Sequence, residues 1–180
     1  MCPVQIRPAS GPEDSDDVID ALLGCHARIR EFTELSLKLA KASPAPGAAK
    51  AAAESLLRYF AEALPRHEAD EDLSLAPRLR AARAPDNVVQ ALDVVSKQHP
   101  DIDRVIGRIA PLWEAIAKDE GQLAAVAERL AQSTERIAVI WTPHLALEET
   151  VVFPAARALL DAKVLAEIRA EMRARRDERF

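Results

Sequence analysis

Hydrophobic residues recur along most of the chain at steps of three and four, the period of an α-helix with one buried face. The clearest example is the segment 86–118, where the steps run 4, 3, 4, 3, 4, 3. No window shows the sustained period-two alternation of β-branched and aromatic residues that indicates a strand. We therefore predict an all-α protein. The stripe in this segment consists of Val88, Leu92, Val95, His99, Ile102, Ile106 and Ile109.

Breaks rich in proline or glycine divide this pattern into four long helical segments. They lie at 43–47, at 84–86 and around Gly121, and each is short enough that consecutive helices must turn back beside one another. We predict an up-down-up-down antiparallel four-helix bundle with a short fifth helix at the C-terminal end. The predicted organisation is an irregular N-terminal arm over 1–13, the bundle over 14–160, and the short helix over 161–180, packed on the bundle or extending from it.

Pro65 lies inside the second predicted helix, which spans about 48–83. Proline has no backbone N–H, and its ring collides with the carbonyl group four residues earlier. We therefore expect a kink or a local bulge next to Pro65.

Composition and charge narrow the possible functions. The chain has 180 residues, 49% of them hydrophobic and 29% charged, which is the balance of a domain with its own core. Its net charge of −5 disfavours a nucleic-acid partner, and no uncharged apolar stretch reaches the ~18 residues of a membrane span. Cys2 and Cys25 form no CxxC pair, and residues 1–7 contain no apolar secretion signal. We expect a cytoplasmic protein with reduced thiols and no nucleic-acid or membrane partner.

The histidines have the most informative distribution. The chain contains four of them, each predicted helix holds one, and each lies on the apolar stripe of its helix. A single histidine on such a face is usually a hydrogen-bonded core residue, but four that point into one core indicate a shared ligand. The four are His26, His67, His99 and His144.

Two carboxylates accompany these histidines. Glu71 and Glu148 each lie four residues after a histidine on the same stripe, and no lysine or arginine on the stripes neutralises them. Because an unpaired carboxylate among apolar side chains is costly, a metal ion is the simplest partner. The alignment extends further, since an acidic residue recurs at +5 (Asp72 and Glu149) and a proline at +10. The bundle therefore consists of two hairpins, each supplying His…His-xxx-Glu.

This ligand set favours a pair of metal ions. Residues at i and i+4 are about 5–6 Å apart on one helix face, so an imidazole and a carboxylate can serve one ion or two neighbouring ions. If Glu71 and Glu148 bridge, each ion has two nitrogen and two oxygen ligands. Such a set favours iron or manganese over a closed structural zinc site. One oxo or hydroxo bridge would make each ion five-coordinate and leave an open position.

The pattern resembles the hemerythrin-like, or HHE cation-binding, family. The resemblance lies in the segments 21–30, 64–77 and 144–154 and in His99, and it spreads over about 15–160. It implies a bundle with a carboxylate-bridged non-haem di-iron centre, for which manganese or zinc are possible substitutes. The implied ligands are His26, His67, Glu71, His99, His144 and Glu148.

Two details refine this resemblance. Oxygen-carrying hemerythrins have a fifth histidine on their third helix, whereas this chain has Val95 and Asp103 at four residues on either side of His99. The four histidines and the HExxE sequence at 67–71 are similar to the hemerythrin-like domain of the iron-sensing F-box protein, which implies Glu68 as a possible additional ligand. A solvated acid on a charged turn is the alternative for Glu68.

Several interpretations remain open from the sequence. Asp72 and Glu149 either accept hydrogen bonds from ligand imidazoles or belong to a solvated face, and the solvated face is favoured. The expected ligand of the centre is a small diatomic molecule or peroxide, which the protein binds, senses or reacts with. The alternatives are a peroxide-disproportionating enzyme, a repair factor for iron centres, or a metal that only fastens the bundle. The sequence does not identify a protein partner.

Overall fold

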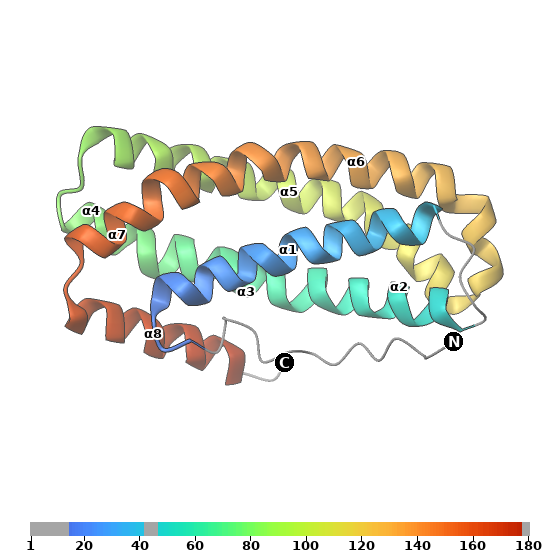
Figure 1. The fold of residues 1–180 in the computed structure, drawn as a ribbon, viewed down its shortest axis with the longest axis horizontal. Helices are drawn as coiled ribbons and strands as arrows, with labels where there is room; N and C mark the ends of the chain where they lie inside the picture. Colours follow the sequence, from blue (N-terminus) through green and yellow to red (C-terminus); the bar gives the residue numbers. More distant parts are fainter. Residues whose placement is uncertain (1–14, 42–46, 178–180) are drawn as a thin grey trace.

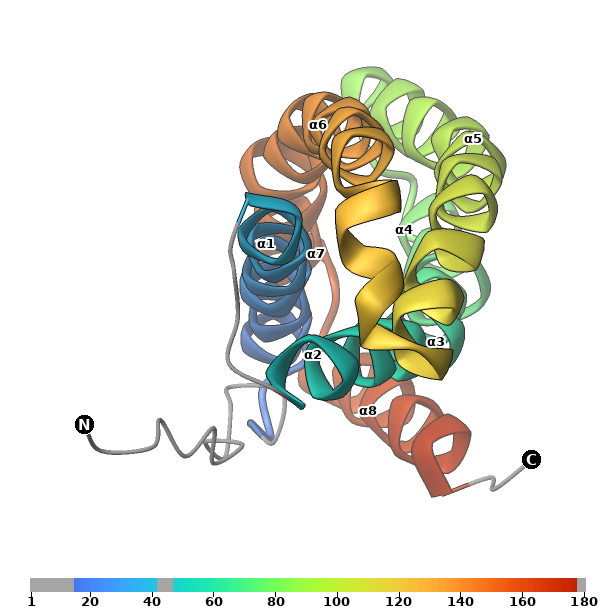
Figure 2. The same cartoon turned by 90° about the vertical axis from the view of Figure 1, so that its right-hand side faces the viewer.

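The molecule is an elongated antiparallel bundle of four helical rods, as the sequence predicts (Figure 1). The computed structural model describes residues 15–41 and 47–177, so the predicted arm over 1–13 lies outside the described residues. Viewed along the bundle, the rods form a ring in the order α1, α2, α5 and α6, and each packs against its two neighbours (Figure 2). The described residues contain no strand, and the prediction of an all-α bundle is confirmed.

Two rods are single helices and two are interrupted. The uninterrupted rods are α1 (Val18–Lys41) and α5 (Asp86–Lys118). The second rod consists of α2 (Ala48–Arg58), η2 (Tyr59–Ala63), α3 (Leu64–Ala69), η3 (Asp70–Leu75) and α4 (Ala76–Ala81). The fourth rod consists of α6 (Leu123–Leu147), η5 (Glu148–Val152) and α7 (Phe153–Leu159), and the short 3₁₀ turn η4 (Glu120–Gln122) precedes it.

The segments η2, η3 and η5 are π-helical turns, and a proline follows each of them at the start of the next α-helix. The prolines are Pro65, Pro77 and Pro154. A π turn inserts one extra residue, which is one way to relieve the clash between the proline ring and the preceding turn. The bulge expected at Pro65 is therefore present, and the two turns that contain the glutamates of the repeated His-xxx-Glu motifs were not foreseen.

The final helix, α8 (Ala162–Asp177), runs beside the bundle and packs against α1, α3 and η3 (Figure 1). Ile168 and Met172 supply its buried apolar face. Its end is tied down by charge, because the fully buried carboxylate of Asp70 accepts hydrogen bonds from Arg175 at 2.7 Å and from Arg176 at 2.8 Å. Two guanidinium groups thus compensate the cost of burying this carboxylate beside the core.

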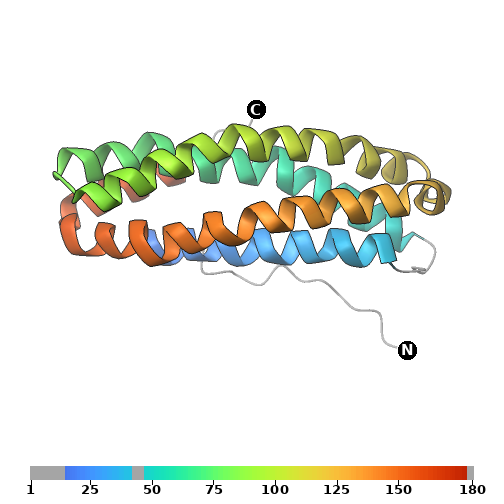
Figure 3. The same ribbon diagram turned by 90° about the horizontal axis from the view of Figure 1, so that it is seen from above.

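Two apolar clusters fill the bundle, one toward each end of its long axis; Figure 3 shows this axis from above. The cluster around Trp113 and Phe60 occupies the half formed by α2 and the start of α6, and the cluster around Leu22 and Phe153 occupies the half formed by α4 and α7. The buried histidines and glutamates of the four rods lie where these clusters meet. Among the described helices, none has an apolar stretch long enough to span a membrane.

Candidate metal centre

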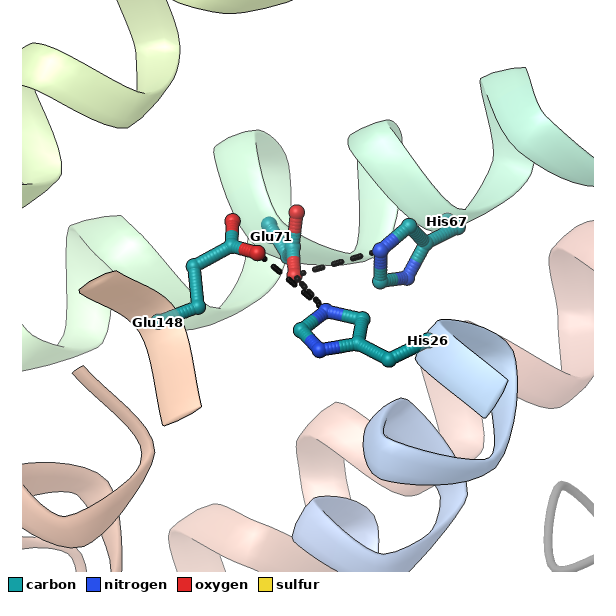
Figure 4. Close-up of side chains that lie close together, drawn as sticks. All are labelled: His26, His67, Glu71 and Glu148. Atoms are coloured by element: carbon teal, nitrogen blue, oxygen red, sulfur yellow. Dashed lines mark ion pairs between the residues drawn. The ribbon is translucent and has the colours of Figure 1, made fainter. Parts of the chain in front are cut away.

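The six predicted ligands come together between the two apolar clusters, one or two from each rod. They form two groups of four residues, and within each group one ligand atom per residue lies within 4.8 Å of all the others. All six side chains are buried. The first group is His26, His67, Glu71 and Glu148, and the second is Glu71, His99, His144 and Glu148. Figure 4 shows the first group, with His26 on α1, His67 on α3, Glu71 on η3 and Glu148 on η5.

Both glutamates belong to both groups, and each presents one oxygen to each hairpin. Glu71 Oε1 lies 3.5 Å from His67 Nε2, and its Oε2 lies 3.5 Å from His99 Nε2. Glu148 Oε2 lies 3.1 Å from His26 Nε2, and its Oε1 lies 3.5 Å from His144 Nε2. Ligand atoms that share an ion at about 2.1 Å are about 3 Å apart. The shared glutamates and the imidazoles around them are therefore spaced as metal ligands are.

The buried polar atoms at the centre support this fit. The Nε2 atoms of His26, His67 and His99 and both oxygens of Glu71 and Glu148 are buried and make no hydrogen bond to any described residue. Buried polar atoms are hydrogen-bonded in the great majority of proteins, and each exception needs an explanation. Seven such atoms that converge on one point, all nitrogen or carboxylate oxygen, are the donor set of a metal site. The chain therefore has the residues of a metal-binding centre in its core.

Three of the four histidines are held in place by a hydrogen bond at Nδ1, on the side of the ring away from the centre. The Nδ1 of His26 lies 2.8 Å from a Glu149 oxygen, and the Nδ1 of His99 lies 2.7 Å from an Asp72 oxygen. These partners fix the ring orientation and leave Nε2 for an ion. The favoured prediction of a solvated face for Asp72 and Glu149 was wrong, because each reaches across to a histidine of the other hairpin while its side chain stays about one-third exposed.

The third outer partner was missed by the sequence analysis. The Nδ1 of His144 lies 2.9 Å from Gln98 Oε1. Gln98 directly precedes His99, so its position next to a histidine was visible, but no repeat drew attention to it. The Nδ1 of His67 is the exception, since it is buried without a hydrogen-bond partner among the described residues.

Charge in the metal-free centre is divided unequally among the imidazoles. Burial opposes protonation of His26, but the carboxylates of Glu148 and Glu71 outweigh it and raise its pKa to about 10. Burial also opposes protonation of His99, yet Glu71 and Asp72 raise its pKa to about 10. Burial prevails at the other two histidines, so that the pKa falls to about 3 at His67 and about 4 at His144.

The two carboxylates that belong to both groups also differ in pKa. Burial, reinforced by the nearby charge of Glu71, raises the pKa of Glu148 to about 8. Burial acts in the same direction on Glu71, but the imidazoles of His67, His26 and His99 outweigh it and hold that pKa well below its usual value. At neutral pH the metal-free centre therefore carries protons on His26, His99 and Glu148, which metal ions must displace.

Glu68 lies outside both ligand groups, so the structure does not bring it together with the other six. Its Oε1 is buried without a hydrogen-bond partner among the described residues, and burial raises its pKa to about 8. The solvated alternative does not describe Glu68 either, because its side chain is buried. A ligand role for Glu68 stays a prediction.

A small cavity of about 10 Å³ lies against Glu71 and Glu148, the glutamates that belong to both groups. It has room for about one water-sized molecule. Val95, one of the two residues four positions from His99, forms part of its wall together with Asp72 and Ser96. Because the side chain of Asp72 is 34% exposed, this side of the centre approaches solvent.

The comparisons with known proteins agree with the geometry. The sequence model described as the hemerythrin HHE cation binding domain matches residues 17–156. An uncharacterized protein of Haemophilus influenzae is 27% identical over 166 residues, which cover 89% of this chain and 91% of that protein. No solved structure matches the chain significantly.

Proposed function

The chain belongs to the hemerythrin HHE cation-binding family, and from that premise we propose that its core holds two iron ions that bind or react with O2 or a related small oxidant such as NO or peroxide. The observation that carries the proposal is the shared pair Glu71 and Glu148, each with one oxygen facing the histidines of each hairpin. A single structural ion would not need two carboxylates common to two ligand groups.

A pair of ferrous ions supplies two electrons in total, one from each ion, to an oxidant that reaches the centre. The protein residues provide the surroundings for this chemistry. Buried apolar side chains on the side of the larger cluster exclude bulk water and admit small uncharged molecules. They are Ile29, Phe60, Leu64, Ile102 and Trp141.

The opposite side of the centre is suited to exchange protons. Asp72 Oδ1 accepts a hydrogen bond from Ser96 at 2.5 Å, and its Oδ2 lies 2.7 Å from His99 Nδ1. Asp72 and Ser96 line the small cavity beside Glu71 and Glu148. A proton from solvent therefore has a short route through Asp72 to this cavity. We expect proton supply there to favour irreversible oxidation of the centre over reversible oxygen carriage.

The test begins with protein reconstituted anaerobically with ferrous iron, which should hold about two ions per chain. Stopped-flow mixing with O2 should convert the near-ultraviolet spectrum to that of ferric iron, and removal of the gas should not restore the ferrous spectrum. Recovery of the ferrous spectrum would identify a reversible carrier. A single tightly held ion would contradict the paired centre.

A matched pair of variants sharpens the test. Val95→His places an imidazole at the cavity wall, where it both fills space and adds a ligand, and it should slow the oxidation. Asp103→His adds the same side chain at an exposed position four residues beyond His99 and should leave the rate unchanged. Equal rates in both variants would show that the cavity at Val95 is not where the oxidant arrives.

A further inference from the structure

The carboxylate that orients His26 is shared with a cation. The Nδ1 of His26 lies 2.8 Å from Glu149 Oε1, and the same oxygen accepts a hydrogen bond from Arg30, also at 2.8 Å. A carboxylate that accepts the outer N–H of a ligand imidazole makes that imidazole a stronger metal ligand. Because the guanidinium group draws on the same oxygen, Glu149 supports His26 less strongly than an unshared carboxylate would.

The carboxylate that orients His99 is not shared in this way. Asp72 Oδ2 lies 2.7 Å from His99 Nδ1, and the neutral hydroxyl of Ser96 donates to the other oxygen, Oδ1. Among residues 15–41 and 47–177, no lysine or arginine forms an ion pair with Asp72. The pseudo-repeat gives the reason, since the residue four positions after the first histidine is Arg30 in one hairpin and Asp103 in the other.

The second histidine of each hairpin shows a further difference. The Nδ1 of His144 lies 2.9 Å from Gln98 Oε1, whereas the Nδ1 of His67 is buried without a hydrogen-bond partner among the described residues. Metal-binding histidines almost always donate this second N–H to an acceptor, which fixes the ring and strengthens the ligand. His67 is therefore the less supported histidine of this pair.

Both differences weaken the same ligand group. His26 and His67 belong to the first group, and His99 and His144 belong to the second. The two glutamates belong to both groups, so they do not offset the difference. Loss of one outer partner of a ligand histidine typically lowers metal affinity about 10–100-fold. We therefore expect the first group to bind a metal ion at least about tenfold more weakly than the second.

We propose that the second ligand group, that of His99 and His144, is the tighter metal position and fills first, and that Arg30 sets part of this preference through Glu149. This order rests on the proposed metal pair and adds how its two positions load. At limiting metal the chain holds one ion, in the second group. The first group takes up its ion only when the concentration of free metal rises further.

Nitrogen-15 NMR of the four imidazoles, recorded while metal-free protein is titrated with diamagnetic Zn²⁺, locates each ion. The Nε2 resonance of a histidine shifts when that nitrogen binds the metal. The first equivalent of Zn²⁺ should shift His99 and His144 in about nine chains of ten, as a tenfold preference requires. The second equivalent should shift His26 and His67. Parallel shifts of all four histidines, or earlier shifts of His26 and His67, would overturn the proposal.

Arg30→Gln tests the contribution of the cation. The Arg30 side chain is 52% exposed, so its replacement leaves the core unchanged. The variant should reduce the preference for the second group about threefold, a modest change because solvent screens a half-exposed charge. Arg104→Gln is the matched control, since it removes the same charge from an exposed position on α5, where Arg104 pairs with Asp101. Equal preferences in the two variants would refute the role of Arg30.

A double variant tests whether the two differences together account for the order. Arg30→Gln with Gln98→Ala leaves each first histidine with an unshared carboxylate and each second histidine without an acceptor. The first equivalent of Zn²⁺ should then divide about equally between the two groups. A preference for His99 and His144 that survives in the double variant would have another cause and would refute the proposal.

The outcome is separable from that of the proposed function, because the titration uses neither iron nor O2. Two Zn²⁺ ions that bind without order would refute the preference and leave the metal pair standing. One ion in the second group that no excess of metal supplements would refute the pair and leave the preference standing.

Discussion

The two hairpins of the bundle build the centre in nearly the same way. In each, the first helix supplies one histidine and the second supplies His-xxx-Glu, whose glutamate lies in a π turn together with the acidic residue that follows it. The acidic residue of each hairpin orients the first histidine of the other, through Glu149 to His26 and Asp72 to His99. Each hairpin therefore depends on the other for the residue that orients its first histidine.

The hairpins differ in the residues beside the shared motif. The residue before the first histidine is Cys25 in one and Gln98 in the other, and the residue after the second histidine is Glu68 in one and Leu145 in the other. As a result, His67 lies beside Glu68 and a pocket lined by arginines. His144 lies beside the buried side chain of Leu145 and forms a hydrogen bond at Nδ1 with the amide of Gln98. The two hairpins thus share the six candidate ligand positions and differ in the residues next to them.

The largest expected effect is on the residues that both halves share. Glu71→Ala and Glu148→Ala should each reduce the iron content from about two ions per chain to well below one, because a bridging carboxylate belongs to both ions. Metal analysis of anaerobically reconstituted protein measures this. Glu68→Ala is the control and should keep two ions, since Glu68 lies outside both groups. Loss of only one ion in Glu71→Ala would show that the halves bind metal independently.

Metal removal tests how much the centre stabilises the packing of the two hairpins against each other. At free metal 100-fold above Kd, each ion should raise the free energy of unfolding by about 2.7 kcal/mol, which corresponds to roughly 5–10 °C per ion for a chain of this size. Calorimetric melting of metal-loaded and metal-free protein at neutral pH gives the difference. Identical melting temperatures would exclude a metal site in the core.

The same difference should depend on pH with a defined sign. The raised pKa values of His26 and His99 stabilise the metal-free fold fully below pH 6.5, and this contribution is lost as the pH rises through about 10. Glu148 is also protonated below about pH 8. Since metal must displace these protons, the melting difference should narrow as the pH falls from 8 to 5. A difference that widened over this range would contradict the proton assignment.

Loss of the contacts that Asp72 and Glu149 make to the histidines of the opposite hairpin should have a smaller effect on metal binding, of the same order for the two residues. Asp72→Ala and Glu149→Ala should each weaken metal binding about 10–100-fold, as expected when the outer partner of a ligand histidine is lost. Competition with a chelator measures the affinity. Asp72→Asn and Glu149→Gln keep an acceptor oxygen and should recover most of it. Alanine variants that bind metal as tightly as the unaltered protein would show that Asp72 and Glu149 do not support the ligand histidines.

The smallest expected effect on metal affinity comes from the residue that precedes the first histidine of each hairpin, where the two hairpins differ. Gln98→Ala removes the acceptor of His144 and should weaken metal binding about tenfold. Cys25→Ala at the equivalent position removes no acceptor from His67 and should leave metal affinity unchanged. Equal losses in both variants would mean that the two histidines are supported alike, against the contacts observed.

The sequence alone determined the bundle and its six candidate ligands. Apolar steps of three and four residues are a property of a single helix, so they placed His26, His67, His99 and His144 on buried faces before any packing was known. The spacing of Glu71 and Glu148 was equally local. Proline chemistry was sufficient to predict a bulge at Pro65, because the clash arises within one helix.

Only the tertiary structure decided which groups lie behind the histidines. The contacts of Asp72, Glu149 and Gln98 join residues 27 to 123 positions apart, and they depend on the rotation and axial shift of one rod against another. Sequence periodicity fixes the face of a helix but not these rigid-body relations. For the same reason the burial of Asp70 beneath Arg175 and Arg176, and the basic pocket behind His67, became visible only once α8 was placed.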